Sequence, residues 1–596
     1  MKKICGWISH MVQRPDLARM ILAAAALIVF LNILPNDFIM DDFDFVLEWN
    51  LIRDLRNLPR FFIDYITPEA QEGIYSPLRT LAFSLNYLIF RDFAAGWHAV
   101  SILIHVFGVW AVYSLTLIMA GNLWAAFLTA LIFAVHPVHI ESVSSITGSI
   151  DTIGVVLGLW SFYWYIRSVL PEGRGHVFHD DGSWNRQGGR DTINKKIYIR
   201  SVVLGVLAIF THEIMLSLPV LIFMFDFLFL EPRFSWKKAL KRAAPFIIAG
   251  IVYVLAKAAV LGGISRGDYA FHNPYLTFLV VIKAWAKYIG VLAFPLVLTH
   301  NRIISNGIMS FDEKDFDRAA FFAQSWHDPL VLLSFGLLLA ILLTGLFFYR
   351  RKPLVSFCIF WFFLSLLPVS QIVPSSVYYA ERYLYAGSWG YCLIFALLLW
   401  KVSRKFATKE KAGAVISVAV CIVIIAYGAR TIMRNRDFHD WTKFYEKAVR
   451  LNPQSAYLKN DLAILYAEEG RYEQAEKEFL SAIEIQKDNP HFYFSLAQAY
   501  AYSGQIRKAM EALEKSIAVN ENFGEAYFNL AIAEVGLGNE EAGRQMFSKA
   551  ISAWKKEGKI LEAGEAVNSF QIFLLNRKGK LKPLSAKDFL GAYVNE

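Results

Sequence analysis

The 596-residue sequence contains little cysteine. The four cysteines form no CxxC pair and have no spacing typical of a metal site. They lie in the N-terminal tail or inside apolar segments, which favours inert packing residues over reactive thiols. Their positions are Cys5, Cys358, Cys392 and Cys421.

Charge is also scarce. Only 19% of the residues are charged, whereas 56% are hydrophobic and 15% are aromatic. The chain is therefore too apolar for an ordinary soluble protein and too long for one domain. Its net charge is +9, but the basic residues cluster in short loops between apolar runs, as membrane topology requires. The sequence predicts a polytopic membrane protein with no nucleic-acid partner.

No small-residue cleavage pattern follows the first apolar run. That run, Met20 to Leu34, follows a basic region and ends before Pro35. We therefore expect an uncleaved signal anchor with a cytoplasmic N-terminus. The short leader favours a bacterial inner membrane.

Apolar runs recur through the first part of the chain. A bilayer crossing needs about 20 residues, and the runs predict about 11 spans. Two further stretches, 77–90 and 275–298, are expected to lie at the outer interface, because counting both as spans would export the basic loop from Lys237 to Arg242. A pair of true spans is the alternative. The predicted spans are 20–34, 97–119, 122–138, 150–169, 197–212, 214–230, 244–262, 329–349, 353–373, 388–402 and 412–429.

After residue 430 the composition becomes amphipathic and charged. Gly470, Gly504 and Gly538 recur at intervals of 34 residues, each preceded by a Leu-Ala pair. This period is typical of tetratricopeptide repeats, which hold two antiparallel helices each and bind proteins on a concave face. By span parity the repeats are expected to be periplasmic. The predicted division is a transmembrane domain at 1–430, repeats at 431–558, and a capping helix and tail at 559–596.

Four carboxylates lie within residues 37–44, directly after the first predicted span. Repulsion between the adjacent Asp41 and Asp42 raises the pKa of one of them, and the flanking Phe43 and Phe45 add desolvation. Such a carboxylate could act as the base of a membrane enzyme that takes a proton from an acceptor hydroxyl. A solvated acidic loop is the alternative, and the residues alone weigh the two about evenly.

The turn from His136 to Glu141 falls on the same predicted outer side as the acidic cluster. Its spacing is not a specific metal spacing, and Pro137 breaks the helix that would align its ligands. Contacts to a phosphate or a sugar are favoured, with packing as the next alternative and a metal as the least. Asp151, at the start of the next span, is a functional candidate because it is ionisable at a membrane edge.

The loop 374–387 contains one basic residue, Arg382, next to Glu381. A guanidinium group matches phosphate oxygens, so Arg382 is a candidate phosphate ligand. A local ion pair with Glu381 is the alternative.

In order along the chain, five motifs and the repeats resemble the transmembrane and tetratricopeptide-repeat O-mannosyltransferase family of the GT-C superfamily. The resemblance covers nearly the whole chain. The motifs are DDFDFV (41–46), YSPLRTLAF (75–83), HPVHIESV (136–143), HE (212–213) and AERYLYAGSWG (380–390).

This resemblance implies an all-α fold, a GT-C-like polytopic helical bundle followed by an α-solenoid. It implies an inverting transfer of a sugar, typically mannose, from a polyprenyl phosphate to Ser or Thr hydroxyls of a protein on the outer side. The expected partners are the polyprenyl-phosphate sugar, membrane lipid, and a protein acceptor or assembly partner on the repeats. The lipid-linked sugar is a substrate; no cofactor is certain, and a divalent metal is left open.

The resemblance also assigns site residues. Asp41 and Asp42 correspond to the catalytic acidic pair, and Arg79, Arg382 and His139 are expected to hold the lipid phosphate. No metal ligands are predicted. The full set of predicted substrate-binding residues is Asp44, Arg79, His136, His139, Glu141, Asp151, Glu213, Glu381 and Arg382.

Three departures from the family pattern each remove a cation. Ser76 stands where the family commonly has arginine, Ser149 lies where a Gly-Arg pair is frequent, and His212 replaces the lysine of a Lys-Glu pair. They leave open a different donor or an altered or lost activity. The other hypotheses are a non-catalytic scaffold for polysaccharide or secretion assembly, and a glycan polymerase or ligase.

Overall fold

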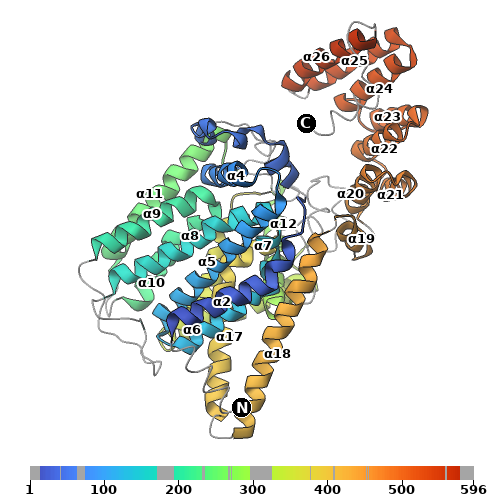
Figure 1. Cartoon of the computed structure of the whole chain (residues 1–596). Helices are drawn as coiled ribbons and strands as arrows, with labels where there is room; N and C mark the ends of the chain where they lie inside the picture. The colour runs from blue at the N-terminus through green and yellow to red at the C-terminus, as the bar shows by residue number, and fades with distance from the viewer. Residues whose placement is uncertain are drawn as a thin grey trace. The chain divides into compact units, whose positions relative to one another are not determined.

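The computed structural model divides the chain into two compact units, Met1–His439 and Asp440–Glu596 (Figure 1). The predicted boundary at 430 falls inside a helix that continues to Asn435. The residues described are 14–39, 42–63, 74–170, 177, 193–230, 235–265, 269, 272–295, 325–375, 377–406, 410–439, 441–451, 453, 455–556 and 560–577.

The described part of the first unit is helical. Its helices are α2 (Pro15–Phe30), η1 (Leu31–Ile33), η2 (Phe43–Glu48), η3 (Asn50–Arg53), η4 (Leu55–Asn57), α3 (Arg60–Ile63), α4 (Pro77–Phe90), α5 (Ala94–Ala120), α6 (Leu123–Val135), η6 (Pro137–His139), α7 (Ile140–Ser144), α8 (Ile146–Val169), α9 (Lys195–Thr211), η7 (Glu213–Ser217), α10 (Leu218–Phe229), α11 (Trp236–Leu261), α12 (Pro274–Ala293), α15 (Pro329–Phe348), α16 (Pro353–Leu366), η9 (Leu367–Val369), η10 (Glu381–Tyr383), α17 (Leu384–Phe406), α18 (Glu410–Asn435) and η11 (Arg436–Phe438).

Eight helices among the described residues are long and apolar enough to cross a membrane, by length and composition. A ninth span results if α6 and the segment from Pro137 to Ser144, which meet at 52°, count as one bent crossing. These helices support the predicted multi-pass membrane protein. Helix α9 matches the span predicted at 197–212. Helix α10 is shorter than the span predicted at 214–230, because η7 occupies Glu213–Ser217 and the α-helix begins only at Leu218, with Pro219 in its first turn.

Helix α12 lies in a stretch, 275–298, that was predicted to be at the outer interface, with a true span as the alternative. Its 20 residues are enough to cross a membrane, whereas α4, with 14 residues, is too short. The lysines that favoured an interfacial position have partners in the structure. Lys283 lies 3.4 Å from Asp328, and Lys287 lies over the ring of Tyr379. Length and composition thus make α12 a candidate span. Its two lysines alone had argued against a span.

Helix α8 packs against both α5 and α9 and positions much of the site. Ser145 caps it by accepting the Gly148 N–H. At Gly154 an added Cβ would lie 2.8 Å from the Cβ of His212, so only glycine permits this close approach of the turn after α9. The packing brings His212 to the same side of α8 as Asp151.

The second unit consists of paired helices, as the 34-residue period predicts. Gly470, Gly504 and Gly538 all have positive φ at the turns between paired helices, which favours glycine. Helix α26 packs on α24 and α25 through a buried apolar cluster that includes Phe570, in the place predicted for the capping helix. The helices are α19 (Trp441–Leu451), α20 (Ala456–Glu468), α21 (Tyr472–Ile485), α22 (Pro490–Tyr502), α23 (Ile506–Val519), α24 (Gly524–Leu537), α25 (Glu540–Lys556) and α26 (Ile560–Arg577).

Candidate active site

The corner between α7 and α8 is the centre of the candidate site. An added Cβ on Gly148 would lie 2.4 Å from the carbonyl oxygen of Glu141, so the two backbones touch directly. Thr152 closes the corner by donating its hydroxyl to the carbonyl oxygens of Ser142 and Gly148. This tight turn places side chains of α7 and α8 on neighbouring faces, and three segments distant in the sequence contact them.

The first of these segments carries Asp42, which is fully buried. One carboxylate oxygen accepts from the backbone N–H and the hydroxyl of Thr147, at 2.9 and 2.6 Å. The other accepts from the Ile39 N–H at 3.2 Å. These hydrogen bonds satisfy the buried carboxylate and fix the segment after α2 against the first turn of α8. Asp41 lies outside the described residues, and so does the side chain of Asp44.

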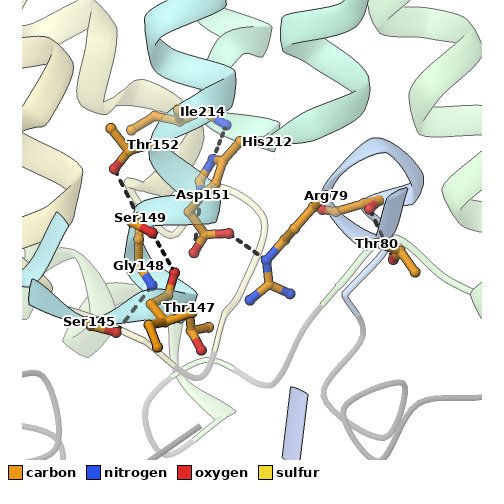
Figure 2. A network of polar contacts seen from close by, with 12 residues as sticks. Arg79, Thr80, Ser145, Thr147, Gly148, Ser149, Asp151, Thr152, His212 and Ile214 are labelled. Atoms are coloured by element: carbon orange, nitrogen blue, oxygen red, sulfur yellow. Dashed lines mark hydrogen bonds and ion pairs between the residues drawn. The ribbon is translucent and has the colours of Figure 1, made fainter. Parts of the chain in front are cut away.

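The second segment contributes Arg79 from α4. Its Nε lies 2.6 Å from Asp151 Oδ1, and both side chains are largely buried. In Figure 2 the guanidinium approaches Asp151 through Nε, while its two terminal nitrogens point away from the carboxylate. The guanidinium also stacks over Phe45 at 4.2 Å and Phe83 at 5.1 Å. Because Phe45 is three residues after Asp42, Arg79 lies against the segment that carries the acidic pair.

His212 lies on the other side of Asp151. Its Nε2 is 4.0 Å from Asp151 Oδ2 (Figure 2), and its Nδ1 accepts the Ile214 N–H at 3.1 Å. Since Nδ1 is an acceptor, the proton of the neutral ring is on Nε2, facing the carboxylate. His212 therefore retains a polar N–H beside Asp151.

The third segment carries Arg382, whose partner is Glu141 of α7. The Arg382 Nη1 lies 2.6 Å from Glu141 Oε1, and the Arg382 backbone N–H donates to Oε2 at 3.0 Å. The carboxylate is 3% exposed and the arginine side chain 20%. Arg382 thus has an ion-pair partner 241 residues away in the sequence, which neither the predicted phosphate contact nor the alternative pair with Glu381 included. Glu381 itself is buried at the start of η10.

The two histidines of the His-Pro turn lie in the core. His136 accepts the Val138 N–H through Nδ1, and its Nε2 faces the carbonyl oxygen of Leu292. His139 is fully buried, with its ring centroid 4.2 Å from that of Phe133 and 4.8 Å from that of Tyr385. Packing, the alternative open at the sequence level, describes both residues better than contact with a phosphate.

Glu213 lies next to His212 but belongs to a separate ion pair. Its Oε2 is 3.1 Å from Lys257 Nζ of α11. Lys257 is absent from the set of predicted residues. A lysine inside an apolar run is a functional candidate by default, so the signal was present in the sequence. Thr147 was also missed, because its contact with Asp42 spans 105 residues and has no local pattern.

Ser76, Ser149 and His212, the three positions where a cation was expected from the resemblance, have different surroundings. Ser149 is buried and accepts from Ser101 of α5 at 2.7 Å, so it faces the interior of the bundle. His212 faces Asp151, as described above. The carbonyl oxygen of Ser76, just before α4, accepts from Thr80. Arg79, one turn into α4, supplies a cation beside Asp151.

A metal site receives no support from the part of the chain that the structure describes. No group of three or more His, Cys, Asp or Glu side chains there could hold a metal ion. Arginine or lysine pairs with the carboxylates of Asp151, Glu213 and Glu141 there.

Family models match the repeats: a TPR repeat model covers residues 463–504 and a tetratricopeptide repeat model covers 490–523. Curated relatives match far more of the chain. A protein O-mannosyl-transferase of Caenorhabditis elegans is 22% identical over 483 residues, 78% of this chain and 62% of its own length. One from Mus musculus is 23% identical over 497 residues, 76% of this chain and 49% of its own.

The chain is related to the transmembrane and tetratricopeptide-repeat O-mannosyltransferases. A Drosophila melanogaster member is 22% identical over 76% of this chain and 60% of its own length. The chain thus spans about half to three fifths of the relatives it matches. Among solved structures, a crystal structure of MamA is 19% identical over 21% of this chain and 81% of that chain, with a TM-score of 0.18, too low to support a statement about the fold.

Proposed function

We propose that this chain is a GT-C-type glycosyltransferase of the bacterial inner membrane. It transfers a sugar, mannose in the simplest case, from a polyprenyl phosphate to a protein hydroxyl on the periplasmic face. One observation carries the proposal: Asp42, the Arg79–Asp151 pair and the Arg382–Glu141 pair all meet at the α7–α8 corner. The relatives named as protein O-mannosyl-transferases support it.

The two carboxylates of the acidic pair have different parts in this proposal. Asp42 accepts at least three hydrogen bonds, so both oxygens of its carboxylate are already engaged by the protein. It positions the segment, and the adjacent Asp41 takes the proton of the acceptor hydroxyl as that oxygen attacks the sugar. Thr147 acts through Asp42, as a positioning residue.

The arginines provide the charge that the departing phosphate needs. Arg79 is oriented through Nε by Asp151, so its terminal nitrogens are available to phosphate oxygens as a planar fork. Arg382 contacts the α7 side of the corner, where Glu141 holds it. Stabilising the developing negative charge on the leaving phosphate lowers the barrier to transfer. Arg79 thereby supplies a cation although Ser76, Ser149 and His212 do not carry the cations usual in the family.

The test compares Asp41→Asn with Asp42→Asn in the full chain, measuring sugar transfer to acceptor protein and thermal stability in detergent. Loss of the base should lower transfer by about 10² to 10⁴-fold in Asp41→Asn with stability unchanged. Asp42→Asn should lower both, because Asn replaces one acceptor oxygen with a donor group facing Thr147 or Ile39. Full transfer by a stable Asp41→Asn protein would refute the assignment of the base.

A further inference from the structure

The last residue of α18, Asn435, is fully buried and bonded to two other parts of the membrane unit. Its Oδ1 accepts from the hydroxyl of Ser144 in α7 at 2.9 Å. Its Nδ2 donates to Asn32 Oδ1 at 2.8 Å and to the carbonyl oxygen of Val29 at 2.9 Å. Both N–H groups and the carbonyl oxygen of the side-chain amide are thus used. One buried amide joins the end of α2 and the helix η1 that follows it to α7.

Asn32 of η1 makes a second bond to α18. Its Nδ2 donates to the carbonyl oxygen of Ile432 at 2.9 Å, so the contact between the two helices runs in both directions. Leaving a buried polar group unpaired is costly, and a network whose members are all bonded therefore favours one arrangement of the segments that carry them. We refer to Asn32, Ser144 and Asn435 as the polar clasp.

The polar clasp lies at the beginning of the segment that carries the acidic pair. That segment follows Asn32 directly, and at its far end Asp42 is bonded to Thr147 at the start of α8. Ser144, the clasp residue of α7, is three residues before Thr147. Both ends of the segment are therefore tied to the α7–α8 corner, one on each side of the turn between the two helices.

Helix α7 also carries the carboxylate that holds Arg382. Glu141, the partner of Arg382, is three residues before Ser144, which is about one helical turn. The polar clasp thus connects the segment with the acidic pair to the same short helix that positions one of the two arginines of the candidate active site.

We propose that the polar clasp positions the catalytic base, with Asn435 as a positioning residue contributed by α18. The inference rests on the proposed function and adds a residue that acts on Asp41 through Asn32 and Ser144. A chain segment held at both ends has fewer conformations than one held at a single end. The clasp therefore narrows the positions open to the base. Releasing it lowers the rate of transfer without weakening the binding of either substrate, because only the orientation of a reacting group changes.

The experiment uses two variants of the full chain that each cut one arm of the polar clasp. Ser144→Ala removes the bond to α7, and Asn32→Ala removes both bonds between Asn32 and α18. Ser356→Ala is the matched control. Ser356 is also a fully buried serine, and its hydroxyl donates one bond between helices, to the carbonyl oxygen of Gly345 at 2.7 Å. It joins α16 to α15, neither of which carries a residue of the proposed site.

Sugar transfer is measured in lipid nanodiscs, with undecaprenyl-phosphate mannose as donor and a threonine-rich peptide as acceptor. Both clasp variants should lower kcat by about 10-fold to 10²-fold with KM unchanged, the loss expected when a reacting group shifts by about 1 Å. Ser356→Ala should keep the unmodified kcat. The proposal is overturned if folded Ser144→Ala and Asn32→Ala proteins transfer at the unmodified rate, or if Ser356→Ala loses as much as they do.

Amide hydrogen exchange, measured by mass spectrometry on the same proteins, tests the polar clasp without reference to catalysis. Residues 33–39 should exchange faster in both clasp variants and at the unmodified rate in Ser356→Ala. Unchanged exchange there in the clasp variants would overturn the proposal even where transfer is lost. An unmodified protein that transfers no sugar would refute the proposed function, whereas normal kcat in the clasp variants would refute the positioning role alone.

Discussion

Two ion pairs, one in the membrane unit and one in the repeats, differ in sequence separation and in burial. Arg382 and Glu141 are 241 residues apart and their side chains are 20% and 3% exposed. Arg544 and Glu540 lie one helical turn apart and are 54% and 40% exposed. Removing one partner of a buried pair leaves an uncompensated charge, whereas an exposed charge is solvated by water. Similar contacts should thus have very different consequences in the two units.

The largest effect is expected for Arg382→Met. It leaves the Glu141 carboxylate buried without its guanidinium partner, which should destabilise the membrane unit by about 3 to 5 kcal/mol. The measurement is the midpoint of thermal unfolding of the full chain in detergent. Adding Glu141→Gln to the variant should restore much of the loss. If Arg382→Met alone unfolds at the unmodified midpoint, the buried pair has no such stabilising role.

Asp226→Asn should have the next largest effect. Asp226 of α10 accepts from the Tyr165 hydroxyl at 2.5 Å and lies 3.3 Å from Arg242. The substitution keeps an acceptor for Tyr165 but removes the charge opposite Arg242, for a loss of about 1.5 to 3 kcal/mol. Sugar transfer per folded molecule should stay unchanged, since this cluster is not part of the proposed site. A selective loss of transfer at normal stability would contradict that separation.

Within the repeats, Gly470→Ala should have a smaller and local effect. Gly470 has a φ of +75°, which alanine adopts at a cost of about 1 kcal/mol. We expect faster amide hydrogen exchange in α20 and α21, measured by mass spectrometry on the full chain, with no change in peptides of the membrane unit. Gly536→Ala is the control, because that glycine lies within a helix and an added Cβ meets nothing within 4 Å.

Glu540→Ala should have the smallest effect. The exposed pair with Arg544 contributes about 0.3 to 0.5 kcal/mol, and salt screens it. Hydrogen exchange in α25 should change slightly in low salt and not at all in high salt. A destabilisation comparable to that of Arg382→Met would remove the distinction between the buried and the exposed ion pair.

Much of the fold could be predicted from the sequence, because helices and repeats leave patterns within short stretches of the chain. The glycine period of 34 residues located the repeats, and each of those glycines has positive φ. Span lengths were less accurate. The α-helix ends before His212 and a 3-10 helix occupies Glu213–Ser217, so α10 begins at Leu218 and is shorter than the predicted 214–230. Hydropathy alone does not distinguish a continuous span from one with such a break.

The site was predictable only in part, because its contacts join distant segments. The convergence of Asp42, Glu141, Asp151 and Arg382 agrees with the expectation that several span ends meet on one face. The partners were not foreseeable: Arg382 was expected at the lipid phosphate, with a pair to Glu381 as the alternative, and it pairs with Glu141. His139 was expected at the lipid phosphate and packs against Phe133. Nothing in the sequence around a histidine shows whether its side chain packs in the core or binds a ligand.

Thr147, which holds Asp42, and Asp151, which orients Arg79, are four residues apart in the first turns of α8. Helix pitch therefore sets the spacing between the segment that carries the acidic pair and the guanidinium group. One residue inserted between them would rotate one contact relative to the other by about 100° and shift it by about 1.5 Å. Insertions in the connecting loops leave this spacing intact, so sequences of this kind can vary widely in loop length but not in the register of these two positions.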